Sequence, residues 1–300
     1  MLRKALMVYL MLVYCLSLSS KAYGTTKYPI LLLHGVAAKS EVLGAHYFGR
    51  LPKALKSKGY EVFDGNHLAW GSFDQNANIL YEDINYITEE LGYEKVNIIS
   101  HSKGGLDARY MLWKYSPVGI SNRVASLTTL NTPHRGSVTA DSLFAVVPDS
   151  LHWIPVMITN VIAAFQGEWN TDSLAVYQSM RTEDMAFLNA IIGDPSEGCA
   201  YEVYCQSYSS IVTESIADKF SQTLAWLNKQ LGKPVNDGLV AGEHSQFGHF
   251  RGLVKPDQGD SISHLGIIDR GRIISHGGTP GFDPISFYHD ILLDLEEKGF

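Results

Sequence analysis

Short apolar runs alternate with amphipathic stretches through the first half of the chain. Strands buried on both faces are predicted where the apolar runs occur, at 28–33, 60–63, 96–99 and 125–130. Helices are predicted where apolar residues recur three and four apart, near 48–58 and over 77–91 and 104–113. Strands that alternate with helices at this spacing predict βαβ units. The expected fold class is therefore α/β, with a mostly parallel, doubly wound sheet and helices on both of its faces.

The pattern changes in the second half. From about 140 to 198 there are two helical stretches and no strand signal, which predicts a helical cap inserted over the sheet. A strand is expected again at 202–212. The last helix has a marked start, with Asp283 as N-cap and Pro284 in the first helical position. A single domain over 25–300 that includes the cap accounts for this pattern, and a chain of 300 residues can bury a full core.

The first 24 residues differ from everything after them. Arg3 and Lys4 precede an apolar run over 5–19 that contains no charge, and small residues stand at positions 22 and 24. This is the pattern of a secretory signal peptide over 1–24, cleaved after Gly24. An uncleaved membrane anchor is the alternative, but the run over 5–19 is shorter than the roughly 20 apolar residues that are needed to span a bilayer. The sequence therefore predicts an exported protein, secreted or periplasmic, with no transmembrane anchor in the mature chain.

Removal of this segment changes the net charge and the cysteine count. It takes away three positive charges and no acid, so the formal net charge goes from −7 to −10. Such a negative protein is a poor match for nucleic acid, and no nucleic-acid partner is expected. Cys15 is lost as well, which leaves Cys199 and Cys205. A disulfide between them is expected in an oxidising compartment, and two unpaired thiols are the alternative.

The strongest chemical signal lies between Val96 and Gly105, where a buried strand runs into a helix through a turn centred on Ser102. A serine in such a turn is exposed at the top of the sheet, and small neighbours let strand and helix approach closely. Ser100 replaces the first glycine of the usual G-x-S-x-G pattern and is still small. A chance turn in an α/β protein is the alternative reading. The position directly after a buried strand favours Ser102 as a nucleophile.

A serine that attacks a carbonyl needs donors for the oxyanion that forms. One backbone N–H would come from the residue after the nucleophile, Lys103, and the other from Val36 in the loop after the first strand. That loop begins with His34 and Gly35, and an ordinary glycine turn is its simpler explanation. His34 and His134 are expected to brace the site through hydrogen bonds rather than to titrate in catalysis.

Ser102 also needs a histidine base and an acid that orients it. In this type of fold the acid and then the histidine follow the serine along the chain. Asp237 on a turn and His264 in a loop before the last helix fit this order. His101 is next to Ser102 and is expected to point away from it. Four further histidines remain open as the base: His244, His249, His276 and His289.

Five segments carry a more specific pattern. They are YPILLLHG at 28–35, ISHSKGGL at 99–106, NTPHRGS at 131–137, NDGLV at 236–240 and SHL at 263–265. In this order they resemble the true-lipase family of Pseudomonas, Burkholderia and Proteus type, which belongs to the α/β-hydrolase superfamily. The resemblance implies that Ser102, Asp237 and His264 are nucleophile, acid and base. It also implies that Val36 and Lys103 donate their backbone N–H groups to the oxyanion.

The resemblance further implies a lid that begins near Ala140. The run between 143 and 165 is too apolar for an exposed helix in water. It could cover an acyl-binding cleft and lift at a lipid surface, or it could be a buried helix pair. Only the first of these two readings predicts activation at an interface.

Two features depart from the family pattern. The family's calcium site uses an aspartate two residues after the catalytic histidine, and Gly266 stands there without an oxygen-bearing side chain. No cofactor is therefore expected to be required, and the sequence argues against a structural calcium ion. The family's disulfide, where present, has one cysteine shortly after the segment at 236–240. A bridge between Cys199 and Cys205 would be of another kind.

The sequence thus predicts a serine-dependent carboxylic ester hydrolase, a triacylglycerol lipase or esterase that acts through an acyl-enzyme on Ser102. A phospholipase, thioesterase or polyester depolymerase would apply the same chemistry to another substrate. A non-catalytic lipid-binding protein would need a broken triad, whereas all three residue types are present in the expected order. The expected partner is a lipid or ester substrate, met at a lipid–water interface, and the need for a folding chaperone stays open.

Overall fold

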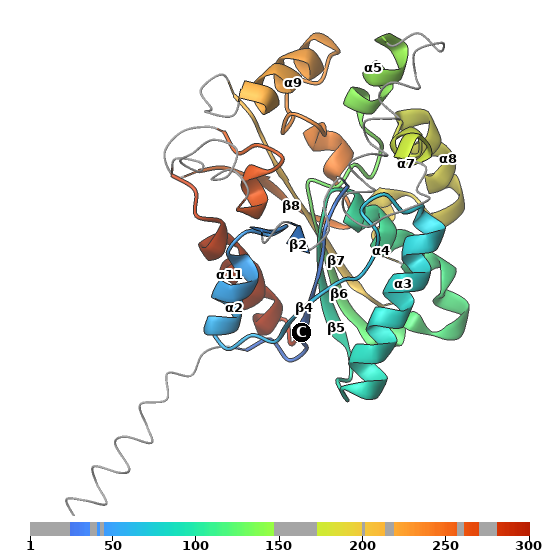
Figure 1. Ribbon diagram of the computed structural model, residues 1–300, viewed down its shortest axis with the longest axis vertical. Coiled ribbons are helices and arrows are strands. Elements are labelled where there is room, and N and C mark those ends of the chain that lie inside the picture. The colour runs from blue at the N-terminus through green and yellow to red at the C-terminus, as the bar shows by residue number, and fades with distance from the viewer. Residues whose placement is uncertain are drawn as a thin grey trace, which may run out of the picture.

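A six-stranded parallel sheet forms the centre of the molecule (Figure 1). The computed structural model describes residues 25–36, 41–42, 45–146, 173–199, 202–213, 219–256, 261–269 and 281–300. The strands of the sheet are β1 (Ile30–Leu33), β4 (Val62–Asp64), β5 (Val96–His101), β6 (Val124–Leu130), β7 (Tyr204–Ser210) and β8 (His249–Val254). Neighbouring strands pair in parallel in the order β4-β1-β5-β6-β7-β8. Two short strands, β2 (Glu41–Val42) and β3 (Ala45–His46), form a separate antiparallel pair.

The central strands are those that the apolar runs predicted. Every residue of β1, β5 and β6 is buried, as expected for strands covered on both faces. The edge strand β8 was not predicted. Its residues are exposed or half-buried and include Arg251 and Gly252, so no apolar run marks it.

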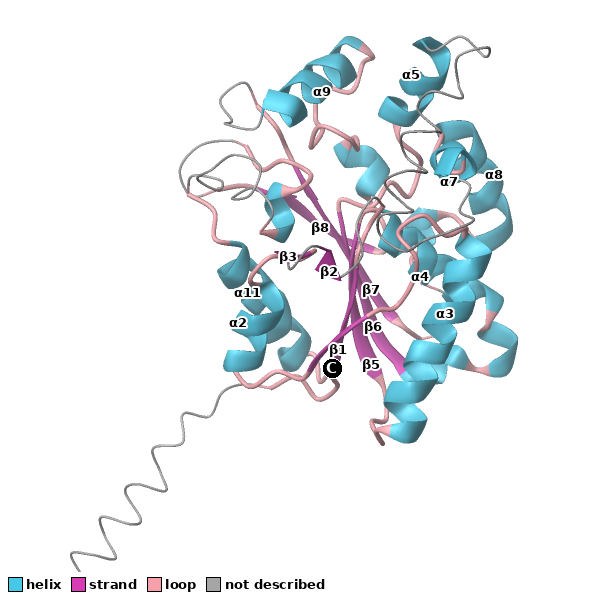
Figure 2. Ribbon diagram, viewed as in Figure 1, coloured by secondary structure: helices cyan, strands magenta, loops and turns pink. Residues whose placement is uncertain are grey.

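Helices cover both faces of the sheet, which confirms the predicted fold class (Figure 2). On one face lie α3 (Phe73–Asn85) and α4 (Lys103–Lys114), and on the other lie α2 (Leu51–Ser57) and α11 (Pro284–Glu297). Helix α3 begins four residues before the predicted start, because Ser72 and Gln75 form a capping box there. Helix α11 begins as predicted, with the Asp283 side chain accepting hydrogen bonds from two backbone N–H groups.

Two cores fill the spaces between the sheet and its helices. Successive residues of a strand point to opposite faces, so β1 contributes to both cores. Ile30 and Leu32 pack in the core below α2 and α11. Leu31 and Leu33 pack in the core below α3 and α4. Strand β1 is therefore packed against the helices on both faces of the sheet. This packing fixes where the loop after β1 leaves the sheet.

Four further helices gather at one end of the molecule (Figure 1). They are α5 (Val138–Val146), α7 (Ser173–Gln178), α8 (Thr182–Ile192) and α9 (Lys219–Gln230). Helix α9 was not predicted. Most of the apolar run at 143–165 and the whole predicted signal peptide lie outside the described residues, so both remain predictions. None of the helices in the described part of the chain combines the length and apolar character needed to cross a membrane.

The strand order brings two of the predicted site loops to the same edge of the sheet. From β1 the chain moves outward to β4, and it then returns past β1 to β5 and continues to β8 at the other edge. Loops that leave the carboxyl ends of strands on either side of such a reversal diverge, and ligands bind between them. Here these loops follow β1 and β5, and they hold residues 34–36 and 102–103.

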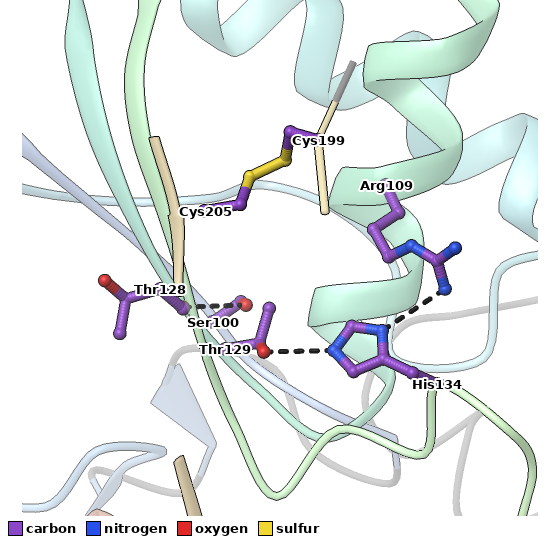
Figure 3. The surroundings of a disulfide bond; sticks show 7 residues. All are labelled: Ser100, Arg109, Thr128, Thr129, His134, Cys199 and Cys205. Carbon is purple, nitrogen blue, oxygen red and sulfur yellow. Dashed lines mark hydrogen bonds between the residues drawn. A yellow bond between two sulfur atoms is a disulfide. The ribbon is translucent and has the colours of Figure 1, made fainter. Parts of the chain in front are cut away.

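A disulfide joins Cys199 to Cys205 (Figure 3), which confirms the pairing expected from the cysteine count. Cys205 lies on β7, and Cys199 follows helix α8 after a short turn. The bridge spans only six positions along the chain. It ties the segment that follows α8 to the sheet.

Replacing both cysteines by alanine is expected to lower the free energy of unfolding by about 2 kcal/mol, because a short closed loop restricts the unfolded chain only modestly. Urea denaturation followed by circular dichroism measures this loss. Reduction of the unmodified protein with dithiothreitol is the control and is expected to give a similar shift. Identical midpoints for oxidised and reduced protein would contradict the prediction.

Candidate active site

Ser102 sits in the tight turn between β5 and α4. Its backbone has φ 54° and ψ −130°, a conformation that is rare for a residue with a side chain. The Ser102 N–H donates a hydrogen bond to the Leu130 carbonyl at 3.0 Å, so the neighbouring strand β6 holds the turn. Ser102 is buried but retains 7% exposure. The turn predicted around Ser102 is therefore present.

Two glycines allow the turn and the loop after β1 to touch. A Cβ atom on Gly104 would lie 2.4 Å from the His34 carbonyl oxygen. A Cβ atom on Gly35 would lie 2.8 Å from the Ser102 Cβ. Real side chains do not approach this closely, so only glycine fits at either position. The loop after β1 consequently lies directly against the Ser102 turn.

The two predicted oxyanion donors lie on either side of this contact. Lys103 is the first residue of α4, so its backbone N–H has no partner within the helix. Val36 follows Gly35 in the loop after β1, and its side chain packs against a small apolar cluster with Leu106 and Met185. The partial positive charge of the α4 N-terminus also acts at this place.

Asp237 and His264 come together although 27 residues separate them. His264 Nδ1 lies 2.7 Å from Asp237 Oδ2, and both side chains are buried. Asp237 Oδ1 accepts hydrogen bonds from the backbone N–H groups of Leu239 and Val240. A carboxylate only accepts, so Nδ1 of His264 carries the proton and Nε2 keeps its lone pair. This is the tautomer that a general base requires.

The backbone of His264 is held at both of its polar groups. Its N–H donates to the Asp237 carbonyl at 2.9 Å. Its carbonyl accepts a hydrogen bond from His101 Nε2, also at 2.9 Å. His101 Nδ1 is therefore unprotonated and accepts the Tyr47 hydroxyl at 2.8 Å. His101 thus braces the loop of His264 instead of acting on Ser102, as its position in the turn predicted.

Three of the four other candidate bases lie in the described part of the chain, and each contacts a residue other than Asp237. His244 Nδ1 lies 2.8 Å from the Gly136 carbonyl. His249 stacks on Tyr204, and His289 packs edge-on against Tyr60. His276 lies outside the described residues. Among the histidines in the described part of the chain, only His264 is hydrogen-bonded to the Asp237 side chain.

A buried ion pair stands directly behind the turn, and it was not predicted. Lys103 Nζ contacts both carboxylate oxygens of Asp107 at 2.7 and 2.9 Å. Asn76 on α3 donates to the same carboxylate, while burial raises the pKa of Asp107. The spacing of four residues on one helix is a known signal for such pairs. Only the backbone N–H of Lys103, and not its side chain, was predicted to have a role.

His34 and His67 form a second buried unit beside the loop after β1. Their rings stack with centroids 3.8 Å apart, and Nε2 of each lies 2.9 Å from the backbone carbonyl of the other. Nδ1 of His34 also faces the Gly35 carbonyl at 2.9 Å. Burial lowers the pKa of His34 to about 4, so the ring is neutral at pH 7 and donates to only one of these carbonyls. His34 therefore braces the loop, as expected.

A third network links helix α4 to strand β6 through His134 (Figure 3). The Arg109 guanidinium donates to His134 Nδ1 at 3.3 Å, and His134 Nε2 then donates to the Thr129 hydroxyl at 3.0 Å. Arg109 also donates to the Asn189 side chain on α8 and to the Gly193 carbonyl. Burial lowers the pKa of Arg109 to about 10, which leaves it charged at pH 7. His134 thus has the bracing role predicted for it.

The residues around His264 do not match a calcium site. Gly266 offers no side-chain oxygen, and the next carboxylate along the loop, Asp269, is bonded to Arg50. In the described part of the chain, no group of three or more histidine, cysteine, aspartate or glutamate side chains could hold a metal ion. A divalent cation prefers several oxygen ligands, and this set does not supply them.

Comparisons with known proteins find related sequences and a related fold. A family model described as alpha/beta hydrolase fold matches residues 28–193. A triacylglycerol lipase of Vibrio cholerae is 30% identical over 301 residues, covering 94% of this chain and 92% of the relative. A triacylglycerol lipase of Pseudomonas fragi is 26% identical, with coverage of 91% and 98%. The crystal structure of Staphylococcus hyicus lipase, at 17% identity, covers 91% of this chain and 97% of its own with a TM-score of 0.63, which shows the shared fold.

The buried histidines make the folded state sensitive to acid. Burial lowers the pKa of four of them: His34, His67, His101 and His134. In the unfolded chain these histidines have their ordinary pKa of about 6.5, which is higher than in the folded protein, so unfolding takes up protons as the pH falls. Stability is then fully present above about pH 6.5 and is lost toward pH 4, with up to about 3 kcal/mol from His34 alone. The raised pKa values of Asp83 and Asp107 act in the opposite direction.

Urea unfolding at a series of pH values between 7.5 and 5 measures this effect. The free energy of unfolding is expected to decrease as the pH is lowered from 7.5 to 5. A free energy that stays constant or increases would contradict the prediction.

Proposed function

This chain belongs to the α/β-hydrolase family and to its bacterial lipase branch, as the sequence motifs predicted, and it is an ester hydrolase; we propose that Ser102, Asp237 and His264 form its catalytic triad. The 2.7 Å hydrogen bond between Asp237 and His264 is the observation that carries this proposal. It is supported by the strained backbone of Ser102, since strain of this kind gathers at functional sites.

In the first half-reaction, Ser102 Oγ attacks the ester carbonyl carbon while His264 Nε2 takes the hydroxyl proton. The Asp237 carboxylate keeps the imidazole in the tautomer with Nε2 free and stabilises the imidazolium that forms. The backbone N–H groups of Val36 and Lys103 stabilise the oxyanion. His264 then gives the proton to the leaving alcohol, which departs and leaves an acyl-enzyme.

In the second half-reaction, water replaces the alcohol. His264 removes a proton from this water as its oxygen attacks the acyl carbonyl, and the same two N–H groups stabilise the second oxyanion. Collapse of this intermediate returns the proton to Ser102 and releases the fatty acid. No step needs a cofactor.

Acylglycerols are the substrates that we favour. The relatives from Vibrio cholerae and Pseudomonas fragi are triacylglycerol lipases by name, and the first of them matches nearly the whole chain. The apolar run at 143–165 would cover or present the acyl-binding surface. We also propose export to the periplasm or the medium, which is supported by the disulfide between Cys199 and Cys205.

A fluorophosphonate probe tests the triad, because it reacts with an activated serine and stays attached. The unmodified protein is expected to be labelled, and Ser102→Ala is expected to lose labelling and at least about 10,000-fold in kcat. Ser57→Ala, at an exposed serine on α2, is the matched control and is expected to be labelled normally. Equal labelling of the Ser102→Ala protein would refute the role of Ser102.

The substrate class is tested by assaying triolein, short p-nitrophenyl esters and phosphatidylcholine in parallel with one preparation of enzyme. Triolein and the p-nitrophenyl esters are expected to be hydrolysed and phosphatidylcholine to be a poor substrate. A preference for phosphatidylcholine over triolein would replace the lipase assignment by a phospholipase while leaving the triad intact.

A further inference from the structure

We propose that Arg50 and Asp269 are positioning residues that hold the loop of His264 in place, a task that this chain performs without a bound metal ion. The inference rests on the proposed function, because the position of this loop matters for the rate only if His264 is the base.

The contact between the two residues is a complete two-pronged ion pair. Arg50 Nε donates to Asp269 Oδ2 and Nη2 donates to Oδ1, both at 2.8 Å. The backbone N–H of Arg50 donates to Oδ2 as well, at 2.9 Å. Bidentate pairs of this kind fix the relative orientation of both groups, not only their distance. The Asp269 side chain is almost fully buried, whereas that of Arg50 is half exposed.

The surrounding backbone is shaped to bring these residues together. Gly49 has φ 57°, and a Cβ atom on it would lie 2.8 Å from Asp269 Oδ2 and 2.9 Å from the Asp269 carbonyl oxygen. Asp269 itself has φ 60°, a left-handed conformation that is uncommon for a residue with a side chain. Such a conformation persists only where neighbouring contacts over-determine it, and the fork of Arg50 supplies them.

The link from Asp269 back to His264 is short and packed. It consists of Leu265 and the single helical turn Gly266–Ile268. Ile267 and Ile268 are fully buried in the core below α2 and α11. Displacement of Asp269 would therefore be transmitted to His264 instead of being absorbed between them.

The segment that carries Arg50 contacts this loop at a second point. Tyr47 holds His101, and His101 holds the His264 carbonyl, as described above. Residues 47–50 thus hold the loop at both of its ends, at His264 through His101 and at Asp269 directly. Arg50 fixes the end that Tyr47 and His101 do not reach.

The chemistry of the pair explains why its loss would move the loop. Without the guanidinium, Asp269 would be a buried charge with no compensating cation from Arg50, which is costly. The loop would shift to bring this carboxylate to water. The Arg50 guanidinium donates a hydrogen bond to each carboxylate oxygen of Asp269. The carboxylate therefore forms an ion pair with arginine and does not serve as a ligand for a metal cation.

The experiment compares Arg50→Met, Arg50→Lys and Asp269→Asn with the unmodified protein, using a p-nitrophenyl ester well below each melting temperature. Arg50→Met is expected to lose roughly 10-fold in kcat with KM close to the original, because misplacing a catalytic group slows chemistry without weakening binding. Asp269→Asn is expected to lose activity in the same way. Arg50→Lys keeps the charge but not the fork, and it is expected to recover part of the rate.

Arg251→Met is the matched control. Arg251 on β8 donates to Asp294 on α11 at 2.9 Å, so this variant also removes an arginine–aspartate pair but leaves the loop of His264 untouched. It is expected to lower the melting temperature without lowering kcat. A loss of kcat as large as that of Arg50→Met would show that general destabilisation is the cause and would overturn the proposal.

Two more outcomes decide the remaining parts. Unchanged kcat in Arg50→Met would overturn the positioning role, and inhibition of the unmodified enzyme by the chelator EGTA would overturn the metal-free part. Full activity in EGTA supports it. Absence of fluorophosphonate labelling in the unmodified protein would instead refute the proposed function, so failure of either proposal is recognised separately.

Discussion

The hydrogen bond from the Ser102 N–H to the Leu130 carbonyl is the contact on which the candidate site depends. A backbone at φ 54° and ψ −130° costs on the order of 1–3 kcal/mol and would relax in a free loop. It is retained because β5 and β6 pair in parallel along their whole length and the bond continues that pairing into the turn. Glycine at position 104 then allows the loop after β1 to reach the same point. The proposed oxyanion donors and the proposed nucleophile are thereby placed by the sheet itself.

The proposed acid and base are held in a different way. Asp237 and His264 lie on loops, so their positions depend on side-chain contacts made across the fold. The two loops are bonded to each other through the His264 N–H and the Asp237 carbonyl as well as through their side chains. His101 adds a contact from the end of β5. The rigid half of the site is therefore built by strands, while the other half is built by individual polar contacts that single substitutions can remove.

This division decides how much could be predicted from the sequence. Strands such as β1 and β5 are apolar on both faces and were predicted, as was the turn around Ser102, because local patterns determine them. The edge strand β8 was missed, since half-exposed residues leave no apolar run. The contact between Arg50 and Asp269 joins positions 219 residues apart, and no local sequence pattern predicts such a pair. The motif resemblance, and not periodicity, singled out His264 among several histidines.

Charge compensation separates the structural carboxylates from the candidate catalytic one. Asp107 is neutralised by Lys103, and Asp269 is neutralised by an arginine, so both charges are consumed in fixed ion pairs. Asp237 is equally buried, yet in the described part of the chain the side chain hydrogen-bonded to it is that of His264. Backbone N–H groups stabilise its charge without cancelling it. Among these three buried carboxylates, the one whose charge is not matched by a lysine or an arginine is thus the one placed against the imidazole. In the proposed reaction, this carboxylate would stabilise the imidazolium that forms on His264.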